Sequence, residues 1–312
     1  MASNTTSNSA IFFRQLWKQR YLHLMIIPVI IWLVLFKYLP ILGVQIAFKN
    51  YKFALGIWGS AWVGLKNINE VLSDVNIYKV TTNTIGISAL KLIFNFPAPI
   101  LFALLLNEVR NIRFKRVIQT ISYFPHFIAY SIVALMITIW LSPSTGFVNN
   151  MLLATGLIKE PVLFLGKAKA FWWIVIFVDI WKNIGWGSII YLAAITGVDQ
   201  NLYEAATVDG AGRLKKITRI TLPCIRPTII ALFILQVGNI FHGANFDLCY
   251  LLSNPLNIER SEILDTYVLR MGISLGRFSY ATAVGLLLSL ISMLLVLSAN
   301  SISKRTLGEG LF

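Results

Sequence analysis

Six stretches of this chain are long and apolar enough to cross a lipid bilayer as helices. A helix needs about 20 apolar residues to span ~30 Å of hydrocarbon. The six stretches cover residues 22–47, 80–106, 118–141, 171–197, 227–251 and 279–303. Hydrophobic residues make up 57% of the 312 residues and charged residues 13%, so a soluble domain could not cover its surface with polar groups. The sequence therefore predicts an all-α, polytopic membrane protein with six transmembrane helices.

The basic residues predict the orientation of these helices. The net charge is +14, which in a soluble protein would point to nucleic acid. Here the lysines and arginines gather in the N-terminal tail, in the short loops after the second and fourth spans, and in the C-terminal tail. Because short cytoplasmic loops carry an excess of Lys and Arg, we expect both termini to be cytoplasmic.

The chain divides into one large domain and two tails. We expect a cytoplasmic tail at residues 1–21, a transmembrane domain at 22–303 and a cytoplasmic tail at 304–312. Within the first tail, residues 11–21 fit an amphipathic helix on the inner membrane surface, or an ordinary basic flank of the first span. That span continues past Pro40 without a small-residue cleavage site, which favours a retained helix over a signal peptide.

The most informative loop covers residues 201–227, between the fourth and fifth spans. Asn201 is expected to cap a short helix, with Glu204 at the capping-box position. Ala205 and Ala206 would allow another protein to come close, and glycines at 210 and 212 would end the helix. The basic segment 213–219 then leads back to the membrane. A short helix of this kind suits docking into a groove on a partner.

This loop resembles the EAA loop of permease subunits of binding-protein-dependent ABC importers. The matching residues are Glu204, Ala205, Ala206, Gly210, Ile220, Leu222 and Pro223. Five other stretches resemble the carbohydrate branch of that family, as found in Gram-positive bacteria: 62–74, 103–116, 123–134, 181–199 and 261–285.

The resemblance implies a type I ABC importer permease fold in a bacterial plasma membrane, serving oligosaccharides. It implies four kinds of partner: a second homologous permease, two copies of a cytoplasmic ABC ATPase, an extracellular solute-binding lipoprotein, and lipid. The expected ATPase-coupling residues are Glu204, Ala205, Ala206, Asp209, Gly210, Gly212, Leu222 and Pro223. No G-x-x-x-x-G-K-[ST] motif occurs, so ATP and Mg²⁺ would be used by the partner ATPase. We expect no cofactor, metal or catalytic residue in this chain.

Polar residues inside the spans mark a candidate substrate path. Charged and amide groups are costly in lipid and therefore face protein or water. The expected path residues are Asp179, Trp181, Lys182, Asn183 and Trp186 in the fourth span, and Gln236 and Asn239 in the fifth, where Asp247 continues the same face. The alternative is structural: Asp179 and Lys182 would neutralise each other, and the amides would bridge helices as polar contacts.

Two other functions stay open from the sequence alone. The chain could be a permease for another solute within the same family, or a secondary transporter or channel from another class. A secondary transporter has no need of an EAA-type docking helix, so the loop at 201–227 favours the ABC importer.

Overall fold

The structure is a computed structural model that describes residues 17–308 and residue 310. Five of the helical segments in this part of the chain are long and apolar enough to cross a membrane, and a sixth span results if one sharply bent helix pair is counted as a single span. The predicted amphipathic helix at 11–21 lies mostly outside the described residues.

The first span is one continuous helical segment of changing pitch. It comprises α2 (Arg20–Leu33), a π-helical turn (Val34–Tyr38) and a 3₁₀ segment (Leu39–Phe48). A small outer subdomain follows, and it contains the two strands of the described chain, β1 (Lys49–Asn50) and β2 (Ala61–Trp62), which pair antiparallel. Its helices are a 3₁₀ turn (Phe53–Leu55), α3 (Gly56–Gly59) and α4 (Lys66–Ser73).

Three further spans follow the sequence prediction closely. The second comprises α5 (Val75–Leu90), a π-helical turn η4 (Lys91–Asn95) and α6 (Pro97–Glu108). The fourth is α10 (Ala168–Thr196), and the last is α17 (Phe278–Leu307). α17 therefore extends four residues into the segment that the sequence assigned to the C-terminal tail.

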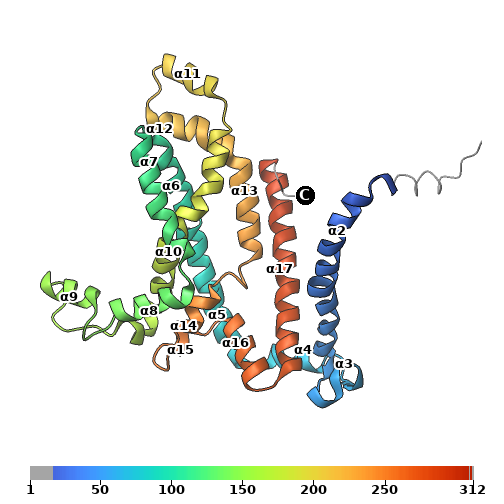
Figure 1. The fold of residues 1–312 in the computed structure, drawn as a ribbon. Coiled ribbons are helices and arrows are strands. Elements are labelled where there is room, and N and C mark those ends of the chain that lie inside the picture. Colours follow the sequence, from blue (N-terminus) through green and yellow to red (C-terminus); the bar gives the residue numbers. More distant parts are fainter. Residues whose placement is uncertain (1–16, 309, 311–312) are drawn as a thin grey trace, which may run out of the picture.

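The third predicted span is broken rather than straight. α7 (Ile112–Tyr123) and a 3₁₀ turn (Phe124–Phe127) meet α8 (Tyr130–Trp140) at a bend of 99°. Pro125 has no backbone N–H for a helical ladder, and Ile128 and Ala129 adopt extended backbone angles. The chain then leads outward through α9 (Phe147–Ala154) and a 3₁₀ turn (Phe164–Gly166), as Figure 1 shows at the left.

The fifth predicted span is also interrupted, so the expectation of one helix over 227–251 was wrong. Its helix starts earlier, with α12 (Arg213–Lys216), a π-helical turn (Ile217–Thr221) and α13 (Leu222–Gly238). The chain turns at 239–245, which we call the break, before α14 (Phe246–Leu251), α15 (Ile258–Ser261), α16 (Leu264–Leu269) and a π-helical turn (Arg270–Ser274). Hydrogen bonds from other helices satisfy carbonyls of the break: Ser88 Oγ donates to Ile240 O at 2.6 Å, and Lys91 Nζ donates to Gly243 O at 2.8 Å.

α10 is the central helix of the molecule and contacts α5, α6, α7, α13 and α15. Two of the three buried apolar clusters include its side chains: Phe171 and Val175 pack with residues of α8 and α14, while Leu192 packs with residues of α6 and α13. A Cβ at Gly185 would overlap the carbonyl group of Ser122 in α7. Gly185 therefore permits the close approach of α7 to α10.

One end of the molecule carries the start of α2, the end of α17 and the short helix α11 (Gln200–Val208) (Figure 1). The outer subdomain with α3 and α4 lies at the other end, beside α16. The basic loops predicted to be cytoplasmic therefore share the α11 end.

Candidate functional site

A cavity of about 660 Å³ lies among α10, α13, the second span and the break. Its lining is rich in amides and aromatic rings. Five of the seven expected path residues line it: Asp179, Asn183, Trp186, Gln236 and Asn239. The structure thus brings together polar groups that lie 60 residues apart in the sequence.

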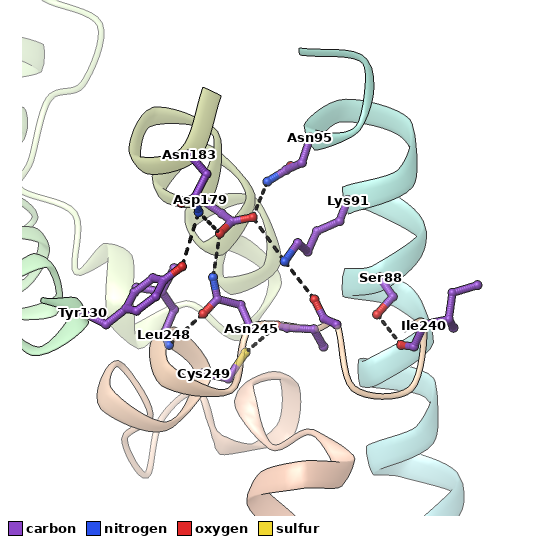
Figure 2. Close-up of polar contacts among 12 residues, drawn as sticks. Ser88, Lys91, Asn95, Tyr130, Asp179, Asn183, Ile240, Asn245, Leu248 and Cys249 are labelled. Carbon is purple, nitrogen blue, oxygen red and sulfur yellow. Dashed lines mark hydrogen bonds and ion pairs between the residues drawn. The ribbon is translucent and has the colours of Figure 1, made fainter. Parts of the chain in front are cut away.

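Asp179 is the centre of the polar contacts in this cavity (Figure 2). Its side chain is buried, and each carboxylate oxygen accepts from two neighbours. Oδ1 accepts from Asn183 Nδ2 at 2.9 Å and from Asn245 Nδ2 at 2.8 Å. Oδ2 accepts from Asn95 Nδ2 at 2.6 Å and lies 3.2 Å from Lys91 Nζ. One carboxylate therefore links the second span, α10 and the break.

Lys91 neutralises Asp179, in place of Lys182, which the sequence offered as the alternative partner. Lys182 is buried, with 3% of its surface exposed. Its ammonium group donates to three carbonyl oxygens at the bend between α7 and α8, those of Pro125 at 3.1 Å, His126 at 2.7 Å and Ile128 at 2.5 Å. Lys182 thus satisfies the backbone of the broken third span, since buried carbonyls without partners are costly.

Trp186 is one of the aromatic residues in the cavity lining, and it stacks on His126, which lies outside the lining. The His126 ring stacks on Trp186 with centroids 4.5 Å apart and planes 2° apart. His126 Nδ1 lies 2.9 Å from Asn183 Oδ1, and Asn183 Nδ2 also donates to Tyr130 Oη at 3.3 Å. Trp186 is 44% exposed and belongs to the cavity lining.

Trp181 and Lys182 lie outside the cavity lining. The Trp181 ring contacts Trp140, with centroids 6.4 Å apart. Trp181 and Lys182 therefore support the bent third span in this structure. Asp247 does line the cavity, but it lies on α14 beyond the break, so it does not continue the helical face of Gln236 and Asn239.

Sequence reasoning missed several polar residues of the cavity lining, among them Lys91, Asn95, His242 and Asn245. Lys91 and Asn95 are four residues apart in an apolar span, and this polar i, i+4 pair was a signal for a shared face. Asn245 adopts a left-handed φ of 67°, a conformation that asparagine tolerates. The Gly243–Asn245 segment was thus a readable sign of a break in the fifth span.

The loop at 201–227 has the opposite character, because its helix is exposed. Glu204, Ala205, Asp209 and Gly210 are all exposed on α11 or just after it, and Val208 is 88% exposed. The expectation that Asn201 caps this helix was wrong. The cap is Asp199, two residues earlier, whose Oδ1 accepts the backbone N–H of Asn201 at 3.0 Å.

Few polar contacts hold α11 to the rest of the loop. Tyr203 Oη lies 2.9 Å from Thr221 Oγ1, and Lys216 Nζ donates to Thr207 Oγ1 at 2.7 Å. Gly210 has a φ of 71°, so it ends the helix in a conformation that suits glycine. Gly212 precedes α12.

The last two expected coupling residues, Leu222 and Pro223, lie at the start of α13. Leu222 packs against the buried cluster of α6, α10 and α13. Pro223 is the second residue of α13, directly after the π-helical turn. Leu222 therefore anchors the loop, while Pro223 and most residues from Glu204 to Gly210 are exposed.

Comparison with known proteins identifies the family. The model for "Binding-protein-dependent transport system inner membrane component" matches residues 95–308. The chain belongs to this family.

The similarity of this permease to known relatives extends over nearly its whole length. It is 43% identical to Protein LplB of Bacillus subtilis over 95% of this chain and 92% of the relative. It is 44% identical to the polygalacturonan/rhamnogalacturonan transport system permease protein YteP of the same organism, over 96% of this chain and 92% of the relative. A solved chain from a bacterial alginate ABC transporter, in complex with alginate pentasaccharide-bound periplasmic protein, superposes with a TM-score of 0.87 at 39% identity, covering 96% of this chain and 99% of that chain.

These findings confirm the multi-pass helical fold, the type I permease architecture and the assignment to a sugar ABC importer that the sequence resemblance implied. They favour the ABC importer over the secondary transporter or channel. Among the described residues, no group of three or more His, Cys, Asp or Glu side chains is arranged to hold a metal ion.

Proposed function

We propose that this permease forms half of the translocation pathway of an ATP-driven importer for oligosaccharides, and that a second homologous permease forms the other half. The observation that supports this most directly is the cavity lined by amides and by aromatic residues, Trp186 among them. Saccharides carry many hydroxyl groups that both donate and accept hydrogen bonds, together with flat apolar faces that stack on aromatic rings. Two of the named relatives point to substrates derived from polysaccharides: the polygalacturonan/rhamnogalacturonan transport system permease YteP and the alginate ABC transporter.

The polar wall of the cavity is also the reason for a second permease. Asp179 lies near the middle of α10, at a depth where lipid offers no hydrogen bonds, and Gln236 and Asn239 at the end of α13 line the same cavity. These side chains need water or protein opposite them. A homologous permease facing α10 and α13 would enclose the path and keep lipid away from it.

ATP binding by the partner ATPase would be coupled to the permease through α11. In this proposal α11 docks into a groove on a cytoplasmic ABC ATPase, with Ala205 and Ala206 permitting close approach and Glu204, Asp209, Gly210 and Gly212 shaping the contact. Two ATPase copies would bind ATP and Mg²⁺, and their closure would move α11 as a rigid body and reorient the cavity. Leu222 and Pro223 would transmit the movement to α13.

The proposed cytoplasmic position of α11 also implies where the other partners would bind. With α11 on the cytoplasmic side, both ends of the chain are cytoplasmic, in agreement with the basic loops at that end. The solute-binding lipoprotein would then deliver saccharide at the opposite end, beside the outer subdomain.

Uptake by the reconstituted assembly tests this function. Vesicles would contain this permease, its homologous partner, the ATPase and the binding protein, with ATP inside and trigalacturonate outside. We expect ATP-dependent accumulation of trigalacturonate that requires the binding protein. A relative named for sn-glycerol-3-phosphate transport, 26% identical, defines the competing substrate class. Uptake of glycerol 3-phosphate without uptake of any oligosaccharide would overturn the proposal.

A further inference from the structure

A groove of about 410 Å³ lies between α7 and the last two turns of α10. Every residue of its lining belongs to one of these two helices. The start of α7 lies at the α11 end of the molecule (Figure 1). Because α10 runs in the opposite direction, its last turns lie beside the first turns of α7. The groove is therefore at the same end as the basic loops.

The lining changes from charged to apolar along the groove. Lys115 and Arg116 belong to the first five residues of α7, and the lining contains no acidic residue. Gln119 follows one turn further along α7, and Tyr123 lies at the far end. The wall on α10 is apolar apart from Thr196, the last residue of that helix. The groove thus has a cationic entrance and a largely apolar interior.

The far end of the groove is where α7 and α10 come into contact. A Cβ at Gly185 would overlap the carbonyl group of Ser122, and Ser122 directly precedes Tyr123. From Lys115 to Tyr123 the groove follows α7 for about 12 Å, at 1.5 Å per residue. The headgroup layer of one leaflet is only about 5–8 Å thick. A groove of this length therefore reaches from the membrane surface into the hydrocarbon.

The two cations at the entrance have no acidic partner. Neither Lys115 nor Arg116 forms an ion pair with any described residue. Arg116 is exposed and Lys115 is half-buried, so both charged groups are available to an anion. Basic pockets between transmembrane helices near the membrane surface are typical sites for acidic lipid headgroups.

An adjoining pocket of about 600 Å³ strengthens the positive charge. It shares Thr196 with the groove and extends to Gln200 and Tyr203 of α11. Its lining contains three basic residues and one acidic residue: Arg110, Arg213, Lys216 and Glu108. An anion at the entrance of the groove would therefore meet further cations on the side of α11.

The groove and the Asp179 cavity lie on different faces of α10. Each residue turns an α-helix by about 100°. Asn183, Trp186 and Ile190 of the cavity lining share one face, whereas Leu192 and Thr196 of the groove lie roughly opposite it. A second permease that encloses the cavity would thus leave the groove open to lipid.

We propose that this groove binds one anionic phospholipid, with the phosphate at Lys115 and Arg116 and an acyl chain between α7 and α10. The charges select the headgroup, because a zwitterionic headgroup carries its own cation whereas an anionic one leaves a net negative charge for the two unpaired cations. Gln119, one turn deeper, has an amide that can donate to the ester oxygens of the lipid. The inference depends on the membrane-spanning fold and is independent of the transported solute.

The test measures lipid binding to the purified permease complex, without transport. After delipidation in detergent, phosphatidylglycerol or phosphatidylcholine is titrated, and bound lipid molecules are counted by native mass spectrometry. We expect phosphatidylglycerol to bind more tightly than phosphatidylcholine. Lys115→Gln/Arg116→Gln should weaken the binding of one phosphatidylglycerol molecule by about fivefold for each charge removed.

The matched control removes a similar pair of charges elsewhere. Lys304→Gln/Arg305→Gln changes an adjacent, exposed Lys–Arg pair in the last turn of α17, at the same end of the molecule. This variant should bind phosphatidylglycerol as tightly as the wild type. An equal loss in the two double variants would show that surface charge in general attracts the lipid, and would overturn the site.

Ala193→Trp tests the apolar part of the groove while both cations remain. Ala193 is an exposed residue of the lining on α10, so a tryptophan there would occupy the space assigned to the acyl chain. The affinity for phosphatidylglycerol should fall about tenfold or more, which corresponds to about two buried CH₂ groups. Unchanged affinity would mean that the phosphate alone is recognised, as a free phosphate ion would be, and would overturn the lipid assignment.

Two further results would contradict the proposal. If Lys115→Gln/Arg116→Gln keeps the wild-type affinity, the groove does not bind the headgroup. If Ala193→Trp separates the two permeases, the groove is a protein interface. None of these results depends on oligosaccharide import, which the vesicle assay measures separately, so this inference and the proposed function can fail independently.

Discussion

The loop at 201–227 and the Asp179 cavity differ in their exposure and in the number of polar contacts that hold their side chains. The loop exposes its helix, and two side-chain contacts tie α11 to the segment that follows it. The cavity buries its central carboxylate under four donors from three segments. A surface that docks a partner has to stay available, whereas a polar wall at membrane depth has to be satisfied internally.

This difference predicts two kinds of mutant. Substitutions on α11 should remove function and leave the permease intact, because its exposed side chains contribute little to folding. Substitution of the central carboxylate Asp179 should damage the fold itself. Substitutions of uncharged amides in the cavity lining should alter transport by modest factors.

The largest effect is expected at the exposed loop. Gly210→Leu places a side chain at a φ of 71°, and Glu204→Lys reverses an exposed charge on the proposed docking face. Each should reduce ATP-dependent import by about a hundredfold or more, as expected for loss of a central contact at an interface. The ATPase should no longer respond to loaded binding protein, while membrane insertion and permease pairing remain normal.

The matched control is Glu160→Lys, the same charge reversal at an exposed position after α9, which should import normally. Normal import by both loop variants would contradict the docking role of α11.

The second effect concerns stability at the centre of the cavity. Asp179→Ala leaves the Lys91 ammonium buried without its counter-charge, a change that costs about 3–5 kcal/mol in folded proteins. We expect a clear fall in the melting temperature of the purified permease complex. Asp247→Ala removes an exposed carboxylate from the same cavity and should leave the melting temperature nearly unchanged.

A compensated variant sharpens this prediction. Lys91→Met/Asp179→Leu removes both charges and should recover part of the lost stability. If Asp179→Ala melts at the wild-type temperature, the buried pair of Lys91 and Asp179 contributes no more to stability than the exposed loop does. The contrast drawn between cavity and loop would then be wrong.

The third effect is expected at two uncharged amides of the cavity lining. Asn183→Ala or Gln236→Ala should lower import by about three- to tenfold, the range expected for one lost hydrogen bond, or change the accepted chain lengths. Stimulation of the ATPase by loaded binding protein should survive, which separates these variants from those on α11. If the variants dissociate the two permeases and leave substrate preference unchanged, the amides serve helix packing.

The sequence predicted the exposed loop better than the buried cavity, and the reason is physical. The loop depends on residues that are close in the chain, such as Glu204, Ala205 and Gly210, so their spacing alone reveals the helix and its end. The ion pair between Lys91 and Asp179 joins positions 88 residues apart, and no local pattern specifies it. The sequence offered Lys182 as the partner because it is one turn away on the same helix.

The broken spans show the same limit. Apolar composition predicted membrane helices over 118–141 and 227–251, since hydropathy does not register a break whose carbonyls find internal donors. Lys182 supplies those donors at the first break, and Ser88 and Lys91 supply them at the second. A lysine in an apolar span is therefore a sign of nearby irregular backbone as much as of a substrate path.

The smallest effect is expected at a second carboxylate, that of the half-buried Asp74, which caps the N-terminus of α5. Asp74 Oδ2 accepts from Tyr267 Oη at 2.6 Å and from Tyr280 Oη at 2.5 Å, and Oδ1 accepts the backbone N–H of Asn76 at 2.9 Å. Partial burial on its own would raise the pKa of Asp74, but these hydrogen bonds outweigh it and lower the pKa below its ordinary value of 3.8. Burial, followed by the bond to Asp74, raises the pKa of Tyr267 to about 12, so its hydroxyl remains a donor.

The sign of the resulting pH dependence follows from the lowered pKa. A carboxyl group with a lower pKa in the folded state stabilises the fold above its unfolded pKa, and this contribution is lost as pH falls through the folded pKa. The wild-type complex should therefore lose its advantage in melting temperature over Asp74→Asn as pH falls below about 4, and the difference between the two should be constant from pH 6 to pH 8. Because Asp74 has neutral donors and no buried cation to leave unpaired, Asp74→Asn should cost much less at neutral pH than Asp179→Ala. An equal loss in the two variants would show that hydrogen bonding alone, without the buried Lys91 charge, explains the sensitivity of the cavity.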